Sequence, residues 1–459
     1  MLKRVLIANR GEIAVRIIRC CIELGVEPVA VYSTADADSL HVQLAAESVC
    51  IGPPRAADSY LNMQAILTAA LQTGCDAVHP GYGFLSENSE FARLCAACGL
   101  KFIGPSGDVI DKMGNKAAAR ALMQEVGVPV VPGSDGPVAT AEDALRAAET
   151  VGYPVLIKAS AGGGGRGMRR ADSAEALPAA FSEARAEAEA CFGDGTLYLE
   201  KLILNPRHIE FQILADQHGH VIHLGERDCS VQRRNQKLME ESPSYAVDDG
   251  LRARMGADAV RAAQAAGYVG AGTIEFVLDR DGNYYFIEMN TRIQVEHPVT
   301  ELVSGVDLIA EQLRIASGLP LPLTQDEVRL TGHAIEVRVN AEDPAHGFRP
   351  APGRVSFLHL PGGCGVRIDT ALFPGCTISP YYDSMAAKVI VHAPTRLGAI
   401  RRLRRALGEL VIEGVPTTAD LAYRILFHPD YVRGRYDTGF LPAELDRLLA
   451  WGEEGGDDA

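Results

Sequence analysis

The chain has 459 residues and 47% of them are hydrophobic, which excludes a wholly disordered protein and predicts about two to four domains. Its 44 basic and 59 acidic residues give a net charge of −15, which argues against general nucleic-acid binding. The apolar stretches are far shorter than the roughly 18 residues of a membrane span, and the N-terminus lacks a signal-peptide core. We therefore expect a cytoplasmic protein with reduced cysteines and without a membrane or nucleic-acid partner.

The first hundred residues alternate between strand and helix patterns. A short apolar run at residues 4–8 precedes Ile13, Ile17, Cys21 and Leu24, which recur at helical spacing, and residues 28–32 read as the next strand. Helices at 61–72 and 88–98 and strands at 76–79 and 101–104 continue the pattern, so a parallel sheet is expected. The turn after the first strand lacks G-x-G-x-x-G, which argues against a nicotinamide-dependent dehydrogenase.

The pattern changes twice further along the chain. After a helix at residues 116–125, a segment rich in proline and glycine at 129–137 reads as a linker. Hairpin strands follow from residue 153, with helices at 173–190 and 248–266. Beyond residues 320–322 we expect strands from 332, then a helix at 397–410 and an acidic tail.

A glycine-rich loop gives the clearest local signal. Five of the six residues 162–167 are glycine, and the loop follows an apolar strand at 154–157. Glycine lets backbone N–H groups approach phosphate oxygens, and Lys158 and Arg166 add positive charge. The spacing is not that of a P-loop. The pattern favours phosphate binding over the alternative of a flexible hairpin tip.

A second signal is a hairpin that carries carboxylates. A two-residue turn at Asp281-Gly282 would pair residue 280 with 283 and so place Glu275 opposite Glu288, with Asn290 on the same face. Like charges directly opposite are destabilising, and Mg²⁺ (or Mn²⁺) with oxygen ligands would offset them. The alternative is a solvated face, and a one-residue bulge would break the pairing.

Two further segments suggest anion chemistry. In the run that begins at Arg292, residues 292, 294 and 296 would project together if the chain stays extended, and an Arg beside a Glu suits anion binding with proton abstraction. Arg233, Arg234 and Lys237 would repel one another unless they face anions. A surface ion pair and an exposed basic loop are the respective alternatives.

Together these segments resemble the biotin carboxylases, the ATP-grasp components of acetyl-CoA and related acyl-CoA carboxylases. The resemblance spans nearly the whole chain, and the long motif at residues 286–298 is its most specific part. The matching segments are Ile7–Ala14, His79–Asn88, the glycine loop, Glu226–Lys237, Phe286–Pro298 and Tyr381–Met385.

The resemblance implies a three-domain ATP-grasp architecture that combines α/β and α+β parts. A Rossmann-like N-terminal domain is expected at residues 1–114 and an ATP-grasp domain at 115–330, with a mobile lid at about 131–203. A C-terminal α+β domain is expected at 331–447, followed by the acidic tail at 448–459.

The resemblance also assigns roles to individual residues. Glu296 would be the general base, Arg292 and Lys237 would bind bicarbonate with Gln294 and the Val295 backbone, and Arg338 would stabilise the biotin enolate. Glu275, Glu288 and Asn290 would hold the metal. The implied nucleotide contacts are Lys116, Lys158, Gly162, Gly163, Gly164, Gly165, Arg166, Gly167, Glu200, Lys201, Leu202, Ile203, His208, Gln232 and Asn235.

The implied reaction is ATP- and bicarbonate-dependent carboxylation of carrier-bound biotin through carboxyphosphate. The sequence contains no Met-Lys dipeptide of the carrier type, so a separate biotin carboxyl carrier protein and carboxyltransferase subunits are expected. A homodimer would pair through Arg16, Arg19 and Glu23. The alternatives are a carbamoyl-phosphate-type or carboxylate–amine ligase and a non-catalytic nucleotide-binding subunit.

Two positions depart from the family pattern. Asn235 stands where many free-standing members have His, which suggests substrates beyond acetyl-CoA and puts its ribose contact in doubt. Ala161 replaces a glycine at the start of the loop, and this matters only if φ there is positive.

Overall fold

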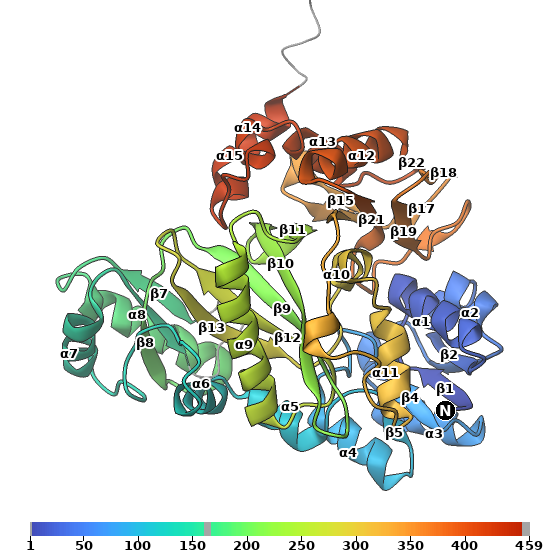
Figure 1. Cartoon of the computed structure of the whole chain (residues 1–459), viewed down its shortest axis with the longest axis horizontal. Coiled ribbons are helices and arrows are strands. Elements are labelled where there is room, and N and C mark those ends of the chain that lie inside the picture. Colours follow the sequence, from blue (N-terminus) through green and yellow to red (C-terminus); the bar gives the residue numbers. More distant parts are fainter. Residues whose placement is uncertain (1, 160–166, 452–459) are drawn as a thin grey trace, which may run out of the picture.

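The computed structural model describes residues 2–159 and 167–451. In Figure 1 a central sheet carries an N-terminal unit at the right, a small lobe at the left and a helical C-terminal part at the top. Within the described residues, no helix combines the length and apolarity needed to cross a bilayer.

The N-terminal unit is a five-stranded parallel sheet with the order β3-β2-β1-β4-β5, which confirms the predicted parallel sheet. Asn62 and Asn88 cap two of its helices by accepting backbone N–H bonds, as their side chains do well at that position. The sequence analysis missed β3, a half-polar strand at the edge of the sheet. The elements are β1 (Arg4–Ile7), α1 (Gly11–Glu23), β2 (Glu27–Ser33), α2 (Leu40–Leu44), β3 (Glu47–Gly52), α3 (Met63–Gln72), β4 (Ala77–His79), α4 (Ser89–Ala97) and β5 (Lys101–Phe102).

The central sheet has eight strands in the order β13-β12-β9-β10-β11-β14-β21-β19 and is antiparallel throughout. It runs without a break across residue 331, so the predicted ATP-grasp and C-terminal parts share one sheet. Helix α9 covers β9 and β10 (Figure 1). The elements are β9 (Arg207–Ala215), β10 (Val221–Arg233), β11 (Gln236–Ser242), α9 (Asp249–Ala266), β12 (Gly270–Leu278), β13 (Tyr284–Asn290), α10 (His297–Ser304), α11 (Leu308–Ala316), β14 (His333–Asn340), β19 (Val366–Thr370) and β21 (Met385–Ala393).

The lobe at the left of Figure 1 is a three-stranded sheet, β7-β6-β8, that packs on two helices around its own apolar cluster. It occupies the region predicted as the lid. Ala161, Gly162, Gly163, Gly164, Gly165 and Arg166 lie outside the described residues. The elements are α7 (Ala141–Val151), β6 (Val155–Ala159), β7 (Met168–Ala171), α8 (Leu177–Phe192) and β8 (Leu197–Lys201), and α5 (Gly107–Gly114) and α6 (Lys116–Glu125) lead into the lobe.

The C-terminal helices cover the outer part of the central sheet and bury a large apolar cluster against it. Helix α15 includes the first residues of the predicted acidic tail, and residues 452–459 lie outside the described part of the chain. The elements are α12 (Arg396–Glu409), α13 (Ala419–Ile425), α14 (Pro429–Val432) and α15 (Phe440–Ala450), with the short strands β15 (Glu342–Asp343), β16 (Arg349–Pro350), β17 (Gly353–Arg354), β18 (Phe357–His359), β20 (Thr377–Ile378) and β22 (Val411–Glu413).

Candidate active site

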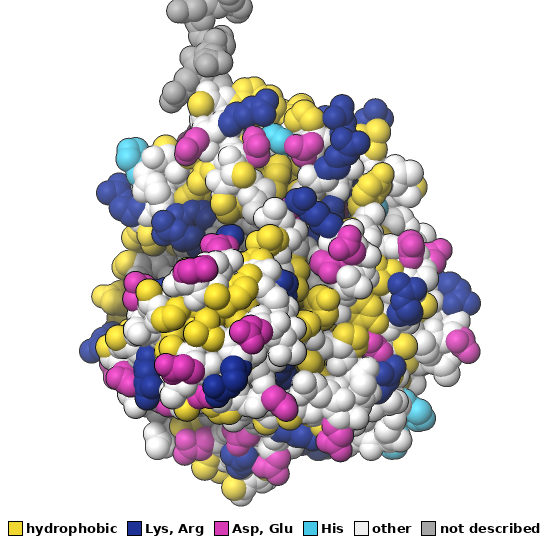
Figure 2. Space-filling model, turned by 90° about the vertical axis from the view of Figure 1, so that its left-hand side faces the viewer, with side chains coloured by type: hydrophobic (Ala, Val, Ile, Leu, Met, Phe, Trp, Pro, Cys, Tyr) yellow, Lys and Arg dark blue, Asp and Glu magenta, His cyan; other side chains and the backbone are white. Residues whose placement is uncertain are grey.

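A cavity of 1310 Å³ is lined by residues of the lid lobe, the central sheet and the N-terminal unit. Figure 2 views the molecule from the lobe's side and shows acidic and basic side chains interspersed over that face. Among the described residues, every predicted site residue except Gly167 lines the cavity. These are Lys116, Lys158, Glu200, Lys201, Leu202, Ile203, His208, Gln232, Asn235, Lys237, Glu275, Glu288, Asn290, Arg292, Gln294, Val295, Glu296 and Arg338.

The lobe side of the cavity contributes two lysines. Lys116 is the first residue of α6, whose N-terminus is capped by the side chain of Asn115, so the ammonium adds to the positive end of that helix. Lys158 on β6 donates a hydrogen bond to Glu200 on the neighbouring strand β8. This end of the cavity therefore suits the phosphates of a nucleotide.

The predicted adenine hinge is the end of β8 and the residues after it. The ammonium of Lys201 turns away to donate to the carbonyls of Gly152 and Tyr153, at 2.9 and 2.7 Å. Lys201 therefore lines the cavity with its backbone, while its ammonium group points away.

Gly167, at φ +70°, lies where an added Cβ would come within 2.8 Å of the Ala159 Cβ.

The carboxylate hairpin has the predicted pair, although its turn differs from the prediction. Glu275 lies opposite Glu288 and Thr273 opposite Asn290. However, the Asp279 amide donates to the Asn283 carbonyl at 2.8 Å, so the loop has three residues and not two. A β-bulge between residues 286 and 288 then restores the register. The longer turn and the bulge each shift the register by one residue, in opposite directions, so Glu275 still lies opposite Glu288. The pairs predicted between the turn and the bulge, such as 279 with 284, were wrong.

The two glutamates are in different electrostatic states. Burial would raise the pKa of Glu275, but the charges of Lys237 and His208 outweigh it and hold that pKa well below its usual range. Burial and then the charge of Glu275 raise the pKa of Glu288. His208 Nε2 lies 2.9 Å from the Glu275 carboxylate, and Asn290 Nδ2 donates to it at 2.8 Å.

The donor set of this hairpin fits a divalent cation. Two carboxylates and a carboxamide are the hard oxygen ligands that Mg²⁺ and Mn²⁺ prefer. A cation there would also remove the repulsion that raises the pKa of Glu288. Glu275, Glu288 and Asn290 would hold it.

Lys237 is the centre of a buried polar cluster. Its Nζ donates to Glu210 and Glu296 at 2.6 Å each, to Glu275 at 3.0 Å and to the side-chain oxygen of Gln294 at 3.1 Å. Burial would lower the pKa of this ammonium, but the three carboxylates outweigh it and raise the pKa well above its usual range. Lys237 is therefore charged at neutral pH and joins the metal hairpin to Glu296.

Glu296 is almost fully buried and lies between two cations. Lys237 donates to one oxygen, and Arg338 donates to the other at 2.9 Å. Burial would raise the pKa of Glu296, but Lys237, Arg338 and Arg227 together hold it well below its usual range. The carboxylate is ionised at neutral pH, which a proton acceptor requires.

The segment that starts at Arg292 places its polar side chains as predicted, by a different path. The chain does not stay extended, because Glu296 has φ −79° and ψ 9° at the start of α10. Arg292, Gln294 and Glu296 nevertheless all line the cavity. Arg292 donates to Glu87 at 3.0 Å and to the Asn290 side-chain oxygen at 3.1 Å, which sets it beside the metal hairpin.

The basic segment on the β10–β11 hairpin divides into different roles. Lys237 faces the carboxylate cluster, and Asn235 lines the cavity at the turn, where it has φ +64°. Arg233 instead lies over the Phe348 ring, 3.9 Å from its centroid, and donates to the Gly347 carbonyl. Of the three cations, only Lys237 has a carboxylate within salt-bridge distance in the described part of the chain, and Arg234 is exposed, as the alternative of an exposed basic loop predicts.

Models of known families match three consecutive parts of the chain. The biotin carboxylase N-terminal domain matches residues 1–110, and the biotin carboxylase C-terminal domain matches 336–443. Between them, the ATP-binding domain of the carbamoyl-phosphate synthase L chain matches 115–324. A biotin carboxylase of a Nostoc species is 58% identical over 95% of this chain and 98% of its own length.

The chain belongs to the biotin carboxylase family. Biotin carboxylase 1 of Bacillus subtilis is 56% identical over 96% of this chain and 98% of its own length. The predictions of an ATP-dependent biotin carboxylase, its three-part fold and its cofactors are confirmed at this level.

Solved structures of other biotin carboxylases share the fold. The biotin carboxylase domain dimer of Hydrogenobacter thermophilus 2-oxoglutarate carboxylase, in complex with MgADP, ADP and bicarbonate, is 50% identical with a TM-score of 0.91. It covers 98% of this chain and 99% of its own. The Campylobacter jejuni biotin carboxylase, in a β,γ-ATP complex, is 48% identical with a TM-score of 0.92 over 96% and 99% of the two chains.

The sequence analysis of this biotin carboxylase missed Glu210 and Arg227. Glu210 is fully buried on β9, two residues after His208, and contacts Lys237. Arg227, also fully buried, donates to Glu210 at 2.5 Å and to the Thr300 hydroxyl at 2.9 Å. The alternation of His208 and Glu210 along one strand was the available signal.

Helix α1 carries the residues predicted for dimer pairing. Arg19 and Glu23 are exposed, and Ile22 between them is 55% exposed. Arg16 is instead partly buried and donates to Glu301 at 3.0 Å and to Asp307 at 2.6 Å within the chain.

Proposed function

We propose that this chain carboxylates biotin on a separate carrier protein, through carboxyphosphate formed from MgATP and bicarbonate. The proposal rests on one observation above all. Lys237 joins Glu296 and Gln294 to Glu275 in one cavity that also contains Lys116, Lys158 and Arg338. Anion, metal and nucleotide sites are therefore contiguous.

In the first step, Lys237 and Arg292 bind bicarbonate and Glu296 accepts its proton. A glutamate with a depressed pKa is a weak base, so the work cannot rest on Glu296 alone. The same cations stabilise the doubly charged carbonate and so lower the pKa of the bound bicarbonate. The cluster thus provides an ionised acceptor, Glu296, and makes the bound bicarbonate a stronger acid.

The bicarbonate oxygen then attacks the γ-phosphorus of ATP, and ADP leaves. Lys116 and Lys158 stabilise charge on the phosphoryl oxygens. Mg²⁺, held by Glu275, Glu288 and Asn290, would neutralise charge on the β- and γ-phosphates. Closure of the lid at about 131–203 would exclude water, which hydrolyses carboxyphosphate.

In the second step, carboxyphosphate releases CO₂ and phosphate within the cavity. The phosphate takes the proton from biotin N1′, and the resulting enolate captures CO₂. Arg338, which donates to both Glu296 and Glu240, is held where its guanidinium can stabilise that enolate.

Release of ADP from MgATP, with and without bicarbonate and free biotin, tests this function. We expect release to require bicarbonate and to be accelerated by biotin. Release that depends on bicarbonate and on an amine, and is indifferent to biotin, would instead indicate a carbamoyl-phosphate-type ligase. No release under any condition would indicate a non-catalytic nucleotide-binding subunit.

A biotin carboxyl carrier protein and carboxyltransferase subunits complete the proposed enzyme. The 459 residues contain no Met-Lys dipeptide of the carrier type, so the biotin that is carboxylated is not attached to any of these residues. A homodimer through the exposed residues Arg19, Ile22 and Glu23 is part of the proposal.

We propose a cytoplasmic location, as for an enzyme of acyl-CoA or 2-oxo acid carboxylation. A relative that is 51% identical is the small subunit of a 2-oxoglutarate carboxylase, so acyl-CoA carboxylation is one of two reaction classes among the relatives.

A further inference from the structure

Lys388 is a fully buried lysine that lies behind the cavity. It belongs to β21, and its Nζ donates to the Val295 backbone carbonyl at 2.9 Å. The same ammonium lies 3.2 Å from Glu12 of α1 and 3.8 Å from Asp369 of β19. It therefore joins the N-terminal unit and the C-terminal part to the segment that precedes Glu296.

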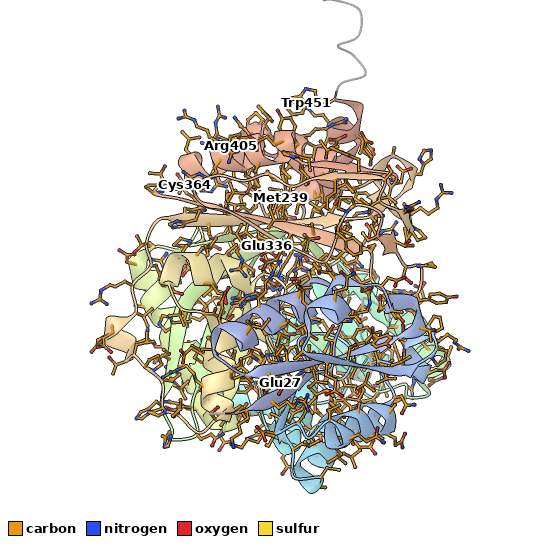
Figure 3. All side chains as sticks on the ribbon, turned by 90° about the vertical axis from the view of Figure 1, so that its right-hand side faces the viewer. Glu27, Met239, Glu336, Cys364, Arg405 and Trp451 are labelled. Carbon is orange, nitrogen blue, oxygen red and sulfur yellow. The ribbon has the colours of Figure 1, made fainter. Side chains whose placement is uncertain are left out.

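A row of charged side chains crosses this side of the central sheet. In the strand register, Arg338 on β14 lies opposite Lys388 on β21, and Lys388 lies opposite Asp369 on β19. The three side chains are therefore neighbours on one face of the sheet. Figure 3 labels Glu336 on this face, above α1, and Met239 on the side of the C-terminal helices. Met239 belongs to the apolar cluster under those helices, as strand alternation requires.

Two buried side chains fix the peptide planes of residues 294–296. Lys388 holds the Val295 carbonyl, and His297 Nδ1 lies 2.8 Å from the Gln294 carbonyl. In a planar trans peptide, the C=O of one residue points opposite to the N–H of the next. The N–H groups of Val295 and Glu296 are thus turned away from the buried side, and both residues line the cavity.

Neither N–H group has an acceptor within residues 2–159 and 167–451. Successive backbone N–H groups aimed the same way form a concavity that binds anions. The two amides are therefore available to an anion in the cavity, next to Lys237 and Arg292.

The charge states of Lys388 and His297 agree with their contacts to the Val295 and Gln294 carbonyls. Burial would lower the pKa of Lys388, but Glu12, Glu336 and Asp369 outweigh it and raise the pKa, so the ammonium persists. Burial, together with the nearby cations Lys388 and Arg367, holds the pKa of His297 well below its usual range. His297 is neutral, and its Nδ1 carries the hydrogen that the Gln294 carbonyl accepts.

We propose that Lys388 is a positioning residue of the bicarbonate site, which it orients by holding the Val295 carbonyl. The inference rests on the proposed function. Lys388 does not line the cavity, so it acts on bicarbonate only through the peptide that it holds.

The test is the steady-state kinetics of Lys388→Met in the full chain, with ADP release as the readout. Misplaced amides should raise the KM for bicarbonate by about tenfold or more, whereas the KM for MgATP should change less than about twofold. Arg396→Met is the matched control. Arg396 is another cation of the C-terminal part that holds backbone carbonyls, those of Tyr431 and Val432, and it does not line the cavity.

The outcomes separate the inference from the function on which it rests. A bicarbonate KM within about twofold of the parent value, or an equal rise of both KM values that Arg396→Met reproduces, would overturn the inference. If Lys388→Met does not fold, Lys388→Met/Asp369→Asn, which removes one charge of each sign, is measured against the same thresholds. A parent chain without bicarbonate-dependent ADP release would refute the proposed function instead.

Discussion

Glu296→Gln is expected to lower the rate of bicarbonate-dependent ADP release by a factor of about 10²–10⁴. The substitution keeps the size of the side chain and removes the proton acceptor. The amide oxygen can accept from one of the two cations, Lys237 or Arg338, and the NH2 group then faces the other, so one of these two hydrogen bonds is lost while both cations remain in the cavity. Because they still bind the anion, the KM for bicarbonate should change far less than kcat.

Glu241→Gln is the matched control for this variant. Glu241 is also a buried glutamate in an ionic cluster, which contains His333 and Arg396, but it does not line the cavity. Burial would raise its pKa, but Arg396 and His333 outweigh that and lower it to about 2. The control should lose stability and keep its turnover. Near-normal turnover in Glu296→Gln would remove Glu296 from the mechanism.

Lys237→Met is expected to abolish measurable bicarbonate-dependent turnover and to destabilise the fold. Removing one partner of a buried ion pair costs about 3–5 kcal/mol, and Lys237 contacts the three carboxylates of Glu210, Glu275 and Glu296. Without the cation, mutual repulsion and burial raise the pKa of each carboxyl group in the folded state.

The sign of the pH dependence follows from that rise. Glutamates whose folded pKa exceeds the ordinary value of about 4.3 bind more protons in the folded than in the unfolded state, so acidification stabilises the variant. In the parent protein Glu275 and Glu296 have depressed pKa values, so their contribution to stability is retained down to about pH 5.5 and is lost only below the ordinary value of about 4.3. The Tm gap between parent and variant should therefore narrow from about pH 8 to about pH 5.5.

Lys101→Met provides the control for the pH effect. Lys101 donates to the Ala316 carbonyl at 3.0 Å and, in the described part of the chain, has no carboxylate partner. Its Tm difference from the parent should not vary with pH. For Lys237→Met, a Tm difference from the parent that stays constant or widens on acidification would contradict the placement of Lys237 among three carboxylates.

Local patterns predicted the elements of the fold better than their pairing. Strand–helix alternation was enough for the parallel N-terminal sheet. In the carboxylate hairpin the predicted turn was one residue too short, and the bulge at Ile287 compensated. The Glu275–Glu288 pair was thus right for a partly wrong reason, since a bulge leaves no signal in a single sequence.

The site residues that the sequence concealed are those whose roles depend on distant segments. Lys388 lies 93 positions from the carbonyl that it holds, and no local motif marks it. Arg233 and Lys237 look alike in the sequence. They differ because strand alternation and the turn aim one at Phe348 and the other at the carboxylates. A cluster of basic residues in a motif predicts a nearby anion, but the tertiary contacts determine which of the basic side chains binds it.

The transfer of oxygen from bicarbonate to phosphate tests the central claim most directly. The protein would turn over MgATP with ¹⁸O-labelled bicarbonate and free biotin in unlabelled water, and the released phosphate would be analysed by mass spectrometry. Attack of a bicarbonate oxygen on the γ-phosphorus predicts phosphate that carries one ¹⁸O atom per turnover. Unlabelled phosphate would mean that water attacks ATP directly, and would contradict carboxyphosphate formation at the cluster of Lys237, Arg292 and Glu296.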